Sequence, residues 1–284
     1  MARLLQHRPK HRFIVLVWLS CVFFDVTRGK AFESYVYSGC SQEKFLPGSQ
    51  LHSNINSFLQ SVVSSSSHVG YNIFALGNRT TSAASEDSLF GLFQCRRDLS
   101  VKECSRCIQS AVNQITLVCP FSYGASLQLE GCSLRYDHVN FLGVPDTSIM
   151  YKRCSEGSPA KDVEFFRRRE EVLTDLRTGG AFKVSSSGFV EGFGQCLGDI
   201  GRSDCSSCLS QATENLKTLC GSAPAAAVFL GQCYAKYWVS GYYDVSSDSN
   251  KEDGAGKTVS VAVGITVGVA IVIVVLSVCR TMRR

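Results

Sequence analysis

Hydrophobic residues recur along this chain with two periods, one typical of helices and one typical of strands. Apolar side chains three or four positions apart fill residues 51–62 and 108–118, as on the inner face of a helix. Residues 71–76 and 88–93 are rich in aromatic and aliphatic side chains, and residues 126–136 alternate polar and apolar positions like one further strand. The pattern predicts an α+β unit in which two helices pack on an antiparallel sheet.

The same order of segments returns in the second half of the chain. Residues 165–176 and 209–219 have helical spacing, and residues 225–238 are typical of a closing strand. The first of these helices contains the charged run 167–171 (RRREE). Because mixed charge on a helix is typical of a solvated face, we expect this run to lie at the surface.

Two longer apolar segments flank the repeated part. Residues 13–24 follow a basic stretch and precede small residues, which predicts a secretory signal peptide over residues 1–29. A signal anchor that stays in the membrane is the alternative, but an apolar run of this length is short for a bilayer span. Residues 259–279 carry no charged side chain and would measure about 31 Å as a helix, close to a hydrocarbon core of about 30 Å. This predicts one C-terminal transmembrane helix, preceded by a polar linker over residues 246–258.

Charge fixes the expected orientation and excludes one class of partner. Arg280, Arg283 and Arg284 follow the span, which predicts a type I orientation with residues 280–284 as a cytoplasmic tail. The formal charge is +5, of which residues 1–29 carry +4 and the tail carries +3, so the remainder carries −2. The folded part therefore has no electrostatic footprint for nucleic acid.

Cysteines show that the chain is a duplication. A ladder with intervals of 9, 3, 12 and 13 positions occurs twice, and one further cysteine, Cys40 or Cys154, precedes each copy. The first ladder is Cys95, Cys104, Cys107, Cys119 and Cys132, and the second is Cys196, Cys205, Cys208, Cys220 and Cys233.

Each ladder contains a Cys-x-x-Cys motif, which is found in redox sites and in zinc sites. No histidine stands at zinc-finger spacing, and two matched sets of six cysteines in a secreted chain favour structural disulfides. Six cysteines allow fifteen pairings per domain, and the spacing alone leaves them all open.

Catalytic signatures do not emerge from the remaining residues. The sequence has no serine elbow and no HExxH helix, and the mature extracellular part would hold only His52, His68 and His138. Asp98 and Asp199 recur in register, where we expect them to cap backbone N–H groups. We therefore predict no enzyme activity, no metal and no cofactor.

The motif around each ladder resembles that of a known family. Its core, QC-x-x-D-[LI]-x(4)-C-x-x-C, resembles the DUF26 (Gnk2-homologous) domain, also known from cysteine-rich repeat secretory proteins. The matching residues are Gln94, Cys95, Asp98, Leu99, Cys104 and Cys107 in one copy, and Gln195, Cys196, Asp199, Ile200, Cys205 and Cys208 in the other. Two such domains, over residues 30–145 and 146–245, followed by one span, resemble the plasmodesmata-located protein family.

The resemblance implies a disulfide pairing of first with fifth, second with third, and fourth with sixth cysteine. The implied pairs are Cys40–Cys119, Cys95–Cys104, Cys107–Cys132, Cys154–Cys220, Cys196–Cys205 and Cys208–Cys233. A mannose-binding member of the wider family uses an Asn, an Arg and an acid at three positions. Here those positions hold Ser41, Ser126 and Asp137 in the first domain, and Ser155, Ala227 and Trp238 in the second. Mannose binding of that type is therefore not expected.

Two further features of the sequence predict a modification and a contact. The sequon at Asn78 predicts N-glycosylation. Ser260, Gly264 and Gly268 stand four apart in the apolar span, so they share one helical face that would let two helices pack closely.

The resemblance also implies a function and a location. It implies a non-enzymatic type I protein of the plasma membrane at plasmodesmata, with apoplastic domains, that modulates cell-to-cell transport and takes part in plant defence through extracellular and in-membrane contacts. Implied partners are the membrane, a second copy or related DUF26 proteins, receptor-like kinases, viral movement proteins and cell-wall glycans. Two alternatives stay open: a membrane-tethered carbohydrate-binding module, and a kinase-less co-receptor of cysteine-rich receptor-like kinases.

Overall fold

The computed structural model describes residues 32–76, 87–157, 162–178 and 180–240. Its elements occur in the same order in the two halves of the chain. The first domain comprises β1 (Tyr35–Cys40), α2 (Gln50–Ser66), β2 (Tyr71–Leu76), β3 (Leu89–Cys95), α3 (Val101–Val118), β4 (Ala125–Leu129) and β5 (Cys132–Asp137). The second comprises β6 (Ile149–Cys154), α4 (Val163–Arg177), β7 (Phe182–Ser187), β8 (Val190–Cys196), α5 (Arg202–Cys220), β9 (Ala225–Leu230) and β10 (Cys233–Val239).

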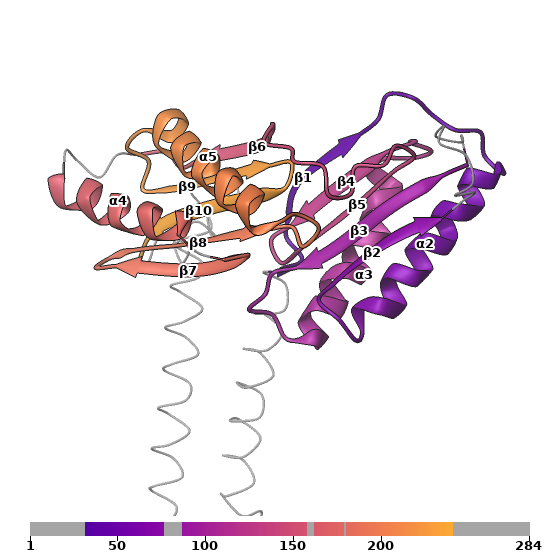
Figure 1. The fold of residues 1–284 in the computed structure, drawn as a ribbon, viewed down its shortest axis with the longest axis horizontal. Helices are drawn as coiled ribbons and strands as arrows, with labels where there is room; N and C mark the ends of the chain where they lie inside the picture. Colours follow the sequence, from indigo (N-terminus) through magenta and orange to yellow (C-terminus); the bar gives the residue numbers. More distant parts are fainter. Residues whose placement is uncertain (1–31, 77–86, 158–161, 179, 241–284) are drawn as a thin grey trace, which may run out of the picture. The chain divides into compact units, whose positions relative to one another are not determined.

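Each domain is a five-stranded sheet with two helices on one face (Figure 1). The strand orders are β1-β4-β5-β3-β2 and β6-β9-β10-β8-β7, so the two sheets have the same topology. The strand pairs run antiparallel, for example β3 with β5, where Cys95 lies opposite Cys132. The predicted architecture of two tandem α+β domains is therefore confirmed.

The predicted closing strand over residues 126–136 is wrong in one respect, because the structure has two strands there. β4 and β5 form a hairpin in which Leu127 lies opposite Leu134. The apolar positions are odd-numbered up to Leu129 and even-numbered from Cys132, and this change of phase marks the turn. The segment 225–238 divides in the same way into β9 and β10.

The first domain's helices begin at side-chain caps and bury the predicted stripes, except that Val118 at the end of α3 is 42% exposed. The Ser49 hydroxyl accepts from the backbone N–H of His52 at the start of α2, and α3 begins with a reciprocal capping box between Ser100 and Glu103. The core of α2 is Leu51, Ile55, Phe58, Leu59 and Val62, the five positions predicted from spacing. Gly91 in β3 makes room for this core, because a Cβ there would lie 2.4 Å from the Phe58 ring.

The charged run of α4 is at the surface except at one residue. Arg167 pairs with Glu164 and Glu171, and hydrogen bonds from Arg167 and Arg168 lower the pKa of Glu164 to about 2. Arg169 is instead buried with 8% of its surface exposed, so the prediction of a fully solvated run is wrong there.

Arg169 is buried because it lies on the apolar stripe of α4, four positions after Phe165. Its guanidinium stacks 5.1–5.7 Å from the ring centroids of Phe165, Phe166 and Tyr237 and donates to the carbonyl of Gly221. Its charge is thus held by aromatic faces and a backbone acceptor.

The predicted signal peptide, linker, membrane span and tail all lie outside the described residues. Among the residues that the structure describes, no helix has both the length and the apolar character that a bilayer crossing needs. These segments stay predictions.

Candidate functional site

The ten ladder cysteines, together with Cys40 and Cys154, form six disulfides, each within one domain. The structure joins Cys40–Cys119, Cys95–Cys104, Cys107–Cys132, Cys154–Cys220, Cys196–Cys205 and Cys208–Cys233. These are the six pairs that the family resemblance implies. The paired Cα atoms lie 5.3–6.0 Å apart, as is usual for disulfides.

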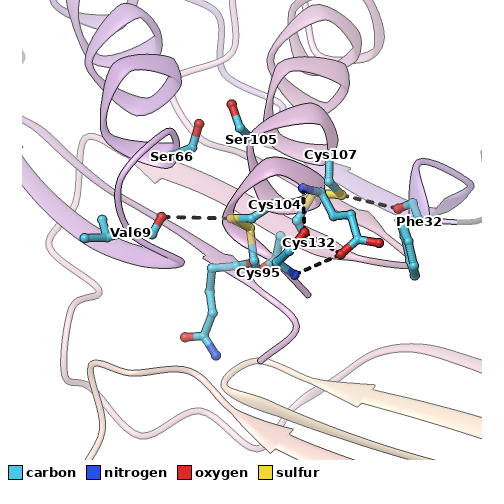
Figure 2. The surroundings of a disulfide bond; sticks show 12 residues. Phe32, Ser66, Val69, Cys95, Cys104, Ser105, Cys107 and Cys132 are labelled. Carbon is cyan, nitrogen blue, oxygen red and sulfur yellow. Dashed lines mark hydrogen bonds between the residues drawn. A yellow bond between two sulfur atoms is a disulfide. The ribbon is translucent and has the colours of Figure 1, made fainter. Parts of the chain in front are cut away.

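The two cysteines of each Cys-x-x-Cys motif bond to different strands and not to each other. At the start of α3, Cys104 bonds to Cys95 at the end of β3, and Cys107 bonds to Cys132 at the start of β5 (Figure 2). The Cys104 sulfur also lies 3.9 Å from the carbonyl oxygen of Val69. The motif therefore fastens the first turns of α3 to two strands of the sheet, and its thiols are engaged in structural bridges.

The sequence-predicted acids have different partners. Asp199 accepts from the backbone N–H of Gly143 at 3.0 Å, which is the predicted capping role, and from Gln232 at 3.2 Å. Asp98 instead accepts from the Arg96 guanidinium at 2.6 Å, so the capping prediction is wrong there.

The three histidines lie on separate elements. His52 is in α2 and its Nδ1 accepts from the Gly48 N–H at 3.0 Å, while His68 follows α2. His138 follows β5, with its Nδ1 3.1 Å from a carboxylate oxygen of Asp137.

The serine after the first cysteine of each domain, which stands at the first position of the mannose triad, bonds within its own domain. The Ser41 hydroxyl donates to the carbonyl of Glu43 at 2.9 Å and accepts from the N–H of Gly124 at 3.1 Å. Ser155 accepts in the same way from Ala225, at 2.9 Å. In both domains, the hydroxyl after the first cysteine therefore ties the end of one strand to the segment that leads into the next.

Two tyrosines of the closing strands that could otherwise stack on a sugar are part of the core. Tyr136 and Tyr237 are buried, with 2% and 0% of their surface exposed, and the Tyr237 hydroxyl donates to the carbonyl of Ala223. Tyr242 and Tyr243 lie outside the described residues, as do the predicted glycosylation site Asn78 and the predicted packing residues Ser260, Gly264 and Gly268.

A site that the sequence did not predict lies where the two domains meet, and buried Gln94 is at its centre. Gln94 Nε2 donates to the carbonyl of Cys196 at 2.8 Å, and Gln94 Oε1 accepts from the N–H of Gly198 at 2.7 Å. Gly198 is also where Tyr71 of β2 approaches, since a Cβ there would lie 2.9 Å from the Tyr71 ring. One side chain of the first domain thus satisfies two backbone groups of the second.

Gln195 of the second domain makes the two equivalent bonds to the backbone of the first domain. Gln195 Nε2 donates to the carbonyl of Cys95 at 3.1 Å, and Gln195 Oε1 accepts from the N–H of Arg97 at 3.2 Å. Equivalent residues of the two ladders are 101 positions apart, so the two sets of bonds are related by a pseudo-two-fold axis. We call this set of four bonds the glutamine clamp.

Tyr37 and Tyr151 lie at the same axis. They occupy equivalent positions in β1 and β6, and their rings stack with centroids 5.6 Å apart at an angle of 16°. Burial raises the pKa of Tyr37 to about 12, so its hydroxyl stays protonated over the physiological range.

An ion pair between Lys236 of β10 and Glu130 of the β4–β5 turn also joins the domains. Lys236 is 3% exposed, and its Nζ lies 5.2 Å and 5.6 Å from the ring centroids of Phe193 and Phe229. Burial lowers the pKa of Lys236, and Glu130 partly opposes this shift. The charged groups at this interface therefore act in domain association.

The sequence contains one sign of the clamp, within the motif that resembles the DUF26 family. Gln94 and Gln195 directly precede a cysteine in each copy, and both side chains are buried. A buried amide needs partners, but only the structure shows that these partners lie about a hundred residues away, in the other domain.

Comparison with known proteins agrees with this geometry. The model of the salt stress response/antifungal family matches residues 39–139 and 153–240. Plasmodesmata-located protein 8 of Arabidopsis thaliana is 55% identical over 247 residues, which cover 87% of this chain and 88% of that protein. Plasmodesmata-located protein 7 of the same plant is 40% identical over 249 residues, covering 87% and 82%.

A solved structure shows the same two-domain arrangement. The crystal structure of the tandem DUF26 ectodomain from the Arabidopsis thaliana cysteine-rich receptor-like protein PDLP8 is 54% identical, with a TM-score of 0.71. It matches 74% of this chain and 100% of that chain. The repeated fold, the six disulfides and these similarities lead to one conclusion: the chain belongs to the salt stress response/antifungal family and, within it, to the plasmodesmata-located proteins.

Proposed function

We propose that this protein is a single-pass type I membrane protein of plasmodesmata that modulates cell-to-cell transport without catalysing a reaction. In this proposal the tandem domains face the apoplast and make the extracellular contacts. Residues 259–279 cross the plasma membrane, and the small residues Ser260, Gly264 and Gly268 make the in-membrane contacts with a second copy or a related DUF26 protein.

The similarity to plasmodesmata-located proteins over 87% of the chain carries this proposal. The structure supports the non-catalytic part, because the titratable groups with shifted pKa values at the domain interface have structural partners. Lys236 pairs with Glu130, and Arg96 with Asp98. Two domains that are each held by three disulfides suit recognition by a fixed surface better than a reaction that needs a mobile site.

The location is tested with a fluorescent protein fused to the full chain at its C-terminus, expressed in leaf epidermis beside a marker for callose at cell junctions. We expect discrete spots that coincide with the marker. A matched control replaces residues 259–279 by an unrelated apolar helix of equal length, which keeps the anchor and removes the specific face. Uniform plasma-membrane fluorescence from the parent chain would contradict the proposal.

The effect on transport is measured by the spread of a free fluorescent protein from single transformed cells. Raising the amount of this protein should change the number of neighbouring cells that the tracer reaches, relative to a control with an unrelated single-pass protein at equal abundance. An unchanged spread, in a line where the fusion does reach the junctions, would remove the transport role and leave the location standing.

A further inference from the structure

The helical layer of the first domain is almost free of charged side chains, unlike that of the second. In the first domain α2 and α3 lie side by side on one face of the sheet (Figure 1). No Asp, Glu, Lys or Arg occurs in residues 45–76, which include all of α2, or in residues 107–122, which include most of α3. In the second domain α4 contains the charged run 167–171, and α5 contains Glu214 and Lys217. The two helical layers therefore suit partners of different chemistry.

Three large apolar side chains are exposed at one end of this uncharged layer, and we call Leu46, Leu117 and Phe121 the apolar tip. Leu46 and Leu117 are 79% and 78% exposed, and Phe121 is 44% exposed. The segments are adjacent, because the N–H of Phe45 donates to the carbonyl of Phe121 at 2.9 Å and Leu117 lies in the last turn of α3. The Phe121 ring is held edge-on against the rings of Phe45 and His52, with centroids 5.9 Å apart. Exposed apolar side chains that gather in this way mark a contact surface.

The fold itself does not require these side chains. The residues 101 positions after Leu117 and Phe121 are Thr218 and Ser222. Phe121 has a φ of 55°, in the left-handed region that aromatic residues rarely adopt, whereas the corresponding turn of the second domain places Gly221 in that region. An unfavourable backbone conformation that keeps a ring at the surface points to a role beyond the fold.

A lipid surface fits the apolar tip better than a protein surface does. Three side chains of this size expose roughly 400 Å², whereas a stable protein interface needs about 800 Å² from each partner. Anionic lipids concentrate in the cytoplasmic leaflet of the plasma membrane, so the outer leaflet presents little net charge. An uncharged layer with an apolar end matches such a surface.

The chain beyond the described domains keeps them close to a bilayer. Residues 241–258 separate these domains from the predicted membrane span over residues 259–279. A flexible segment of this length has a mean end-to-end distance of about 25 Å and reaches about 60 Å at most. A weak contact is sufficient at this range, because a tethered surface meets its partner at a high effective concentration.

We propose that the apolar tip inserts into the outer leaflet of the membrane in which the chain is anchored. The Ser, Asn and Gln side chains of α2 and α3 can enter the headgroup region beside it without removing a charge from water. Lys44, which precedes the loop of Leu46, donates from its ammonium group to the Ser122 hydroxyl at 2.6 Å. This inference rests on the membrane anchor of the proposed function and is independent of the role in transport.

The test places the full chain, one copy per disc, in phosphatidylcholine nanodiscs with and without bromine on the acyl chains. Bromine quenches tryptophan fluorescence at contact, and Leu46→Trp or Leu117→Trp puts the probe in the apolar tip. Val163→Trp, at an 80% exposed position of α4, is the matched control. Trp238 is the one tryptophan outside the predicted signal peptide, so the parent chain gives the background. We expect about threefold more quenching in the two tip variants than in the control, and equal quenching would overturn the proposal.

A second substitution tests whether the tip acts as one surface. Leu46→Trp combined with Leu117→Asp should lose the excess quenching, because the new carboxylate would have to leave water. Val163→Trp combined with Leu117→Asp should behave like Val163→Trp alone. An excess that survives Leu117→Asp would overturn the proposal.

The same spectra distinguish lipid from protein and from failure of the anchor. A blue-shifted emission of Leu46→Trp without bromine quenching would show that protein covers the tip, and would overturn the proposal. A chain that enters the discs and shows no excess quenching would overturn this inference alone. A chain that does not enter the discs would contradict the membrane anchor, and with it both the proposed function and this inference.

Discussion

The two domains share a fold and differ most where they meet. The same residue types occur in both at the axis itself, where Gln94 faces the backbone of the second domain, Gln195 faces that of the first, and Tyr37 stacks on Tyr151. Away from the axis, Lys236 of the second domain pairs with Glu130, whereas its equivalent Arg135, 101 positions earlier, is in none of the ion pairs among the described residues and stacks on Phe141.

This difference shows which parts of a duplicated interface are free to diverge. A residue at a two-fold axis contacts its own equivalent, so a change in one copy must suit the other copy as well. Residues further from the axis contact non-equivalent neighbours and change independently. The symmetric part of the interface therefore holds the two glutamines and the tyrosine stack, and the asymmetric part holds the Lys236–Glu130 ion pair.

The largest expected effect tests whether the two domains depend equally on their long disulfide loops. Cys40→Ser with Cys119→Ser opens a loop of 79 residues, and Cys154→Ser with Cys220→Ser opens one of 66. The chain-entropy model gives a loss of about 4 to 5 kcal/mol in the free energy of unfolding for either pair. Guanidinium unfolding measures both losses. A difference above about 2 kcal/mol between them would show that loop entropy is not the main contribution.

The next effect tests the ion pair at the interface. Glu130→Gln leaves the Lys236 charge buried without a partner and should lower the free energy of unfolding by about 3 kcal/mol, the lower end for buried pairs because Glu130 is partly exposed. Arg135→Met, at the equivalent position of the first domain, should change it by less than about 1 kcal/mol, because Arg135 is in none of the ion pairs among the described residues. Equal losses in thermal unfolding would contradict the asymmetry.

The pH dependence of the ion pair has a defined sign. Burial lowers the pKa of Lys236, so below about pH 10 the unfolded state binds more protons than the folded state at this residue. The contribution of Lys236 to the free energy of unfolding should therefore rise with pH, and more steeply in Glu130→Gln than in the parent. Lys236→Met is the control, and the rise should be absent from it. A fall in stability over pH 7 to 10 that Lys236→Met abolishes would reverse the assignment.

The smallest effect compares the N-termini of α3 and α5. Ser100→Ala removes the capping box of α3 and should lower the free energy of unfolding by about 1 kcal/mol. In α5 the cap is Gly201, which has no side-chain bond, and its φ of −70° suits other residues. Gly201→Ser should therefore raise stability by a few tenths of a kcal/mol. Chemical denaturation resolves both, and a loss in Gly201→Ser would show that the end of α5 is constrained by something other than its cap.

The sequence predicted those features that depend on local spacing. Periodicity placed the buried stripe of α2 from Leu51 to Val62, and the family resemblance implied the six disulfides that the structure contains. The hairpin within residues 126–136 was missed although the phase of its apolar positions changes at Glu130. Arg169 was predicted to be solvated because of its charge, although its position lies on the apolar stripe of α4.

The interface between the domains could not be predicted from local patterns. Gln94 and its partner Cys196 are separated by 102 positions, and nothing near either residue specifies the other. Their contact follows from how two complete sheets dock, which depends on side chains from several strands at once.

The central claim is that the glutamine clamp makes the two domains one cooperative unit, and differential scanning calorimetry of the purified protein tests it most directly. Each glutamine satisfies two backbone groups, and its loss should lower the interface free energy by about 1 to 3 kcal/mol. We predict one transition for the parent, with equal calorimetric and van't Hoff enthalpies. Gln94→Ala combined with Gln195→Ala should separate it into two transitions at lower temperatures. Two independent transitions in the parent, or an unchanged single transition in the double variant, would contradict the claim.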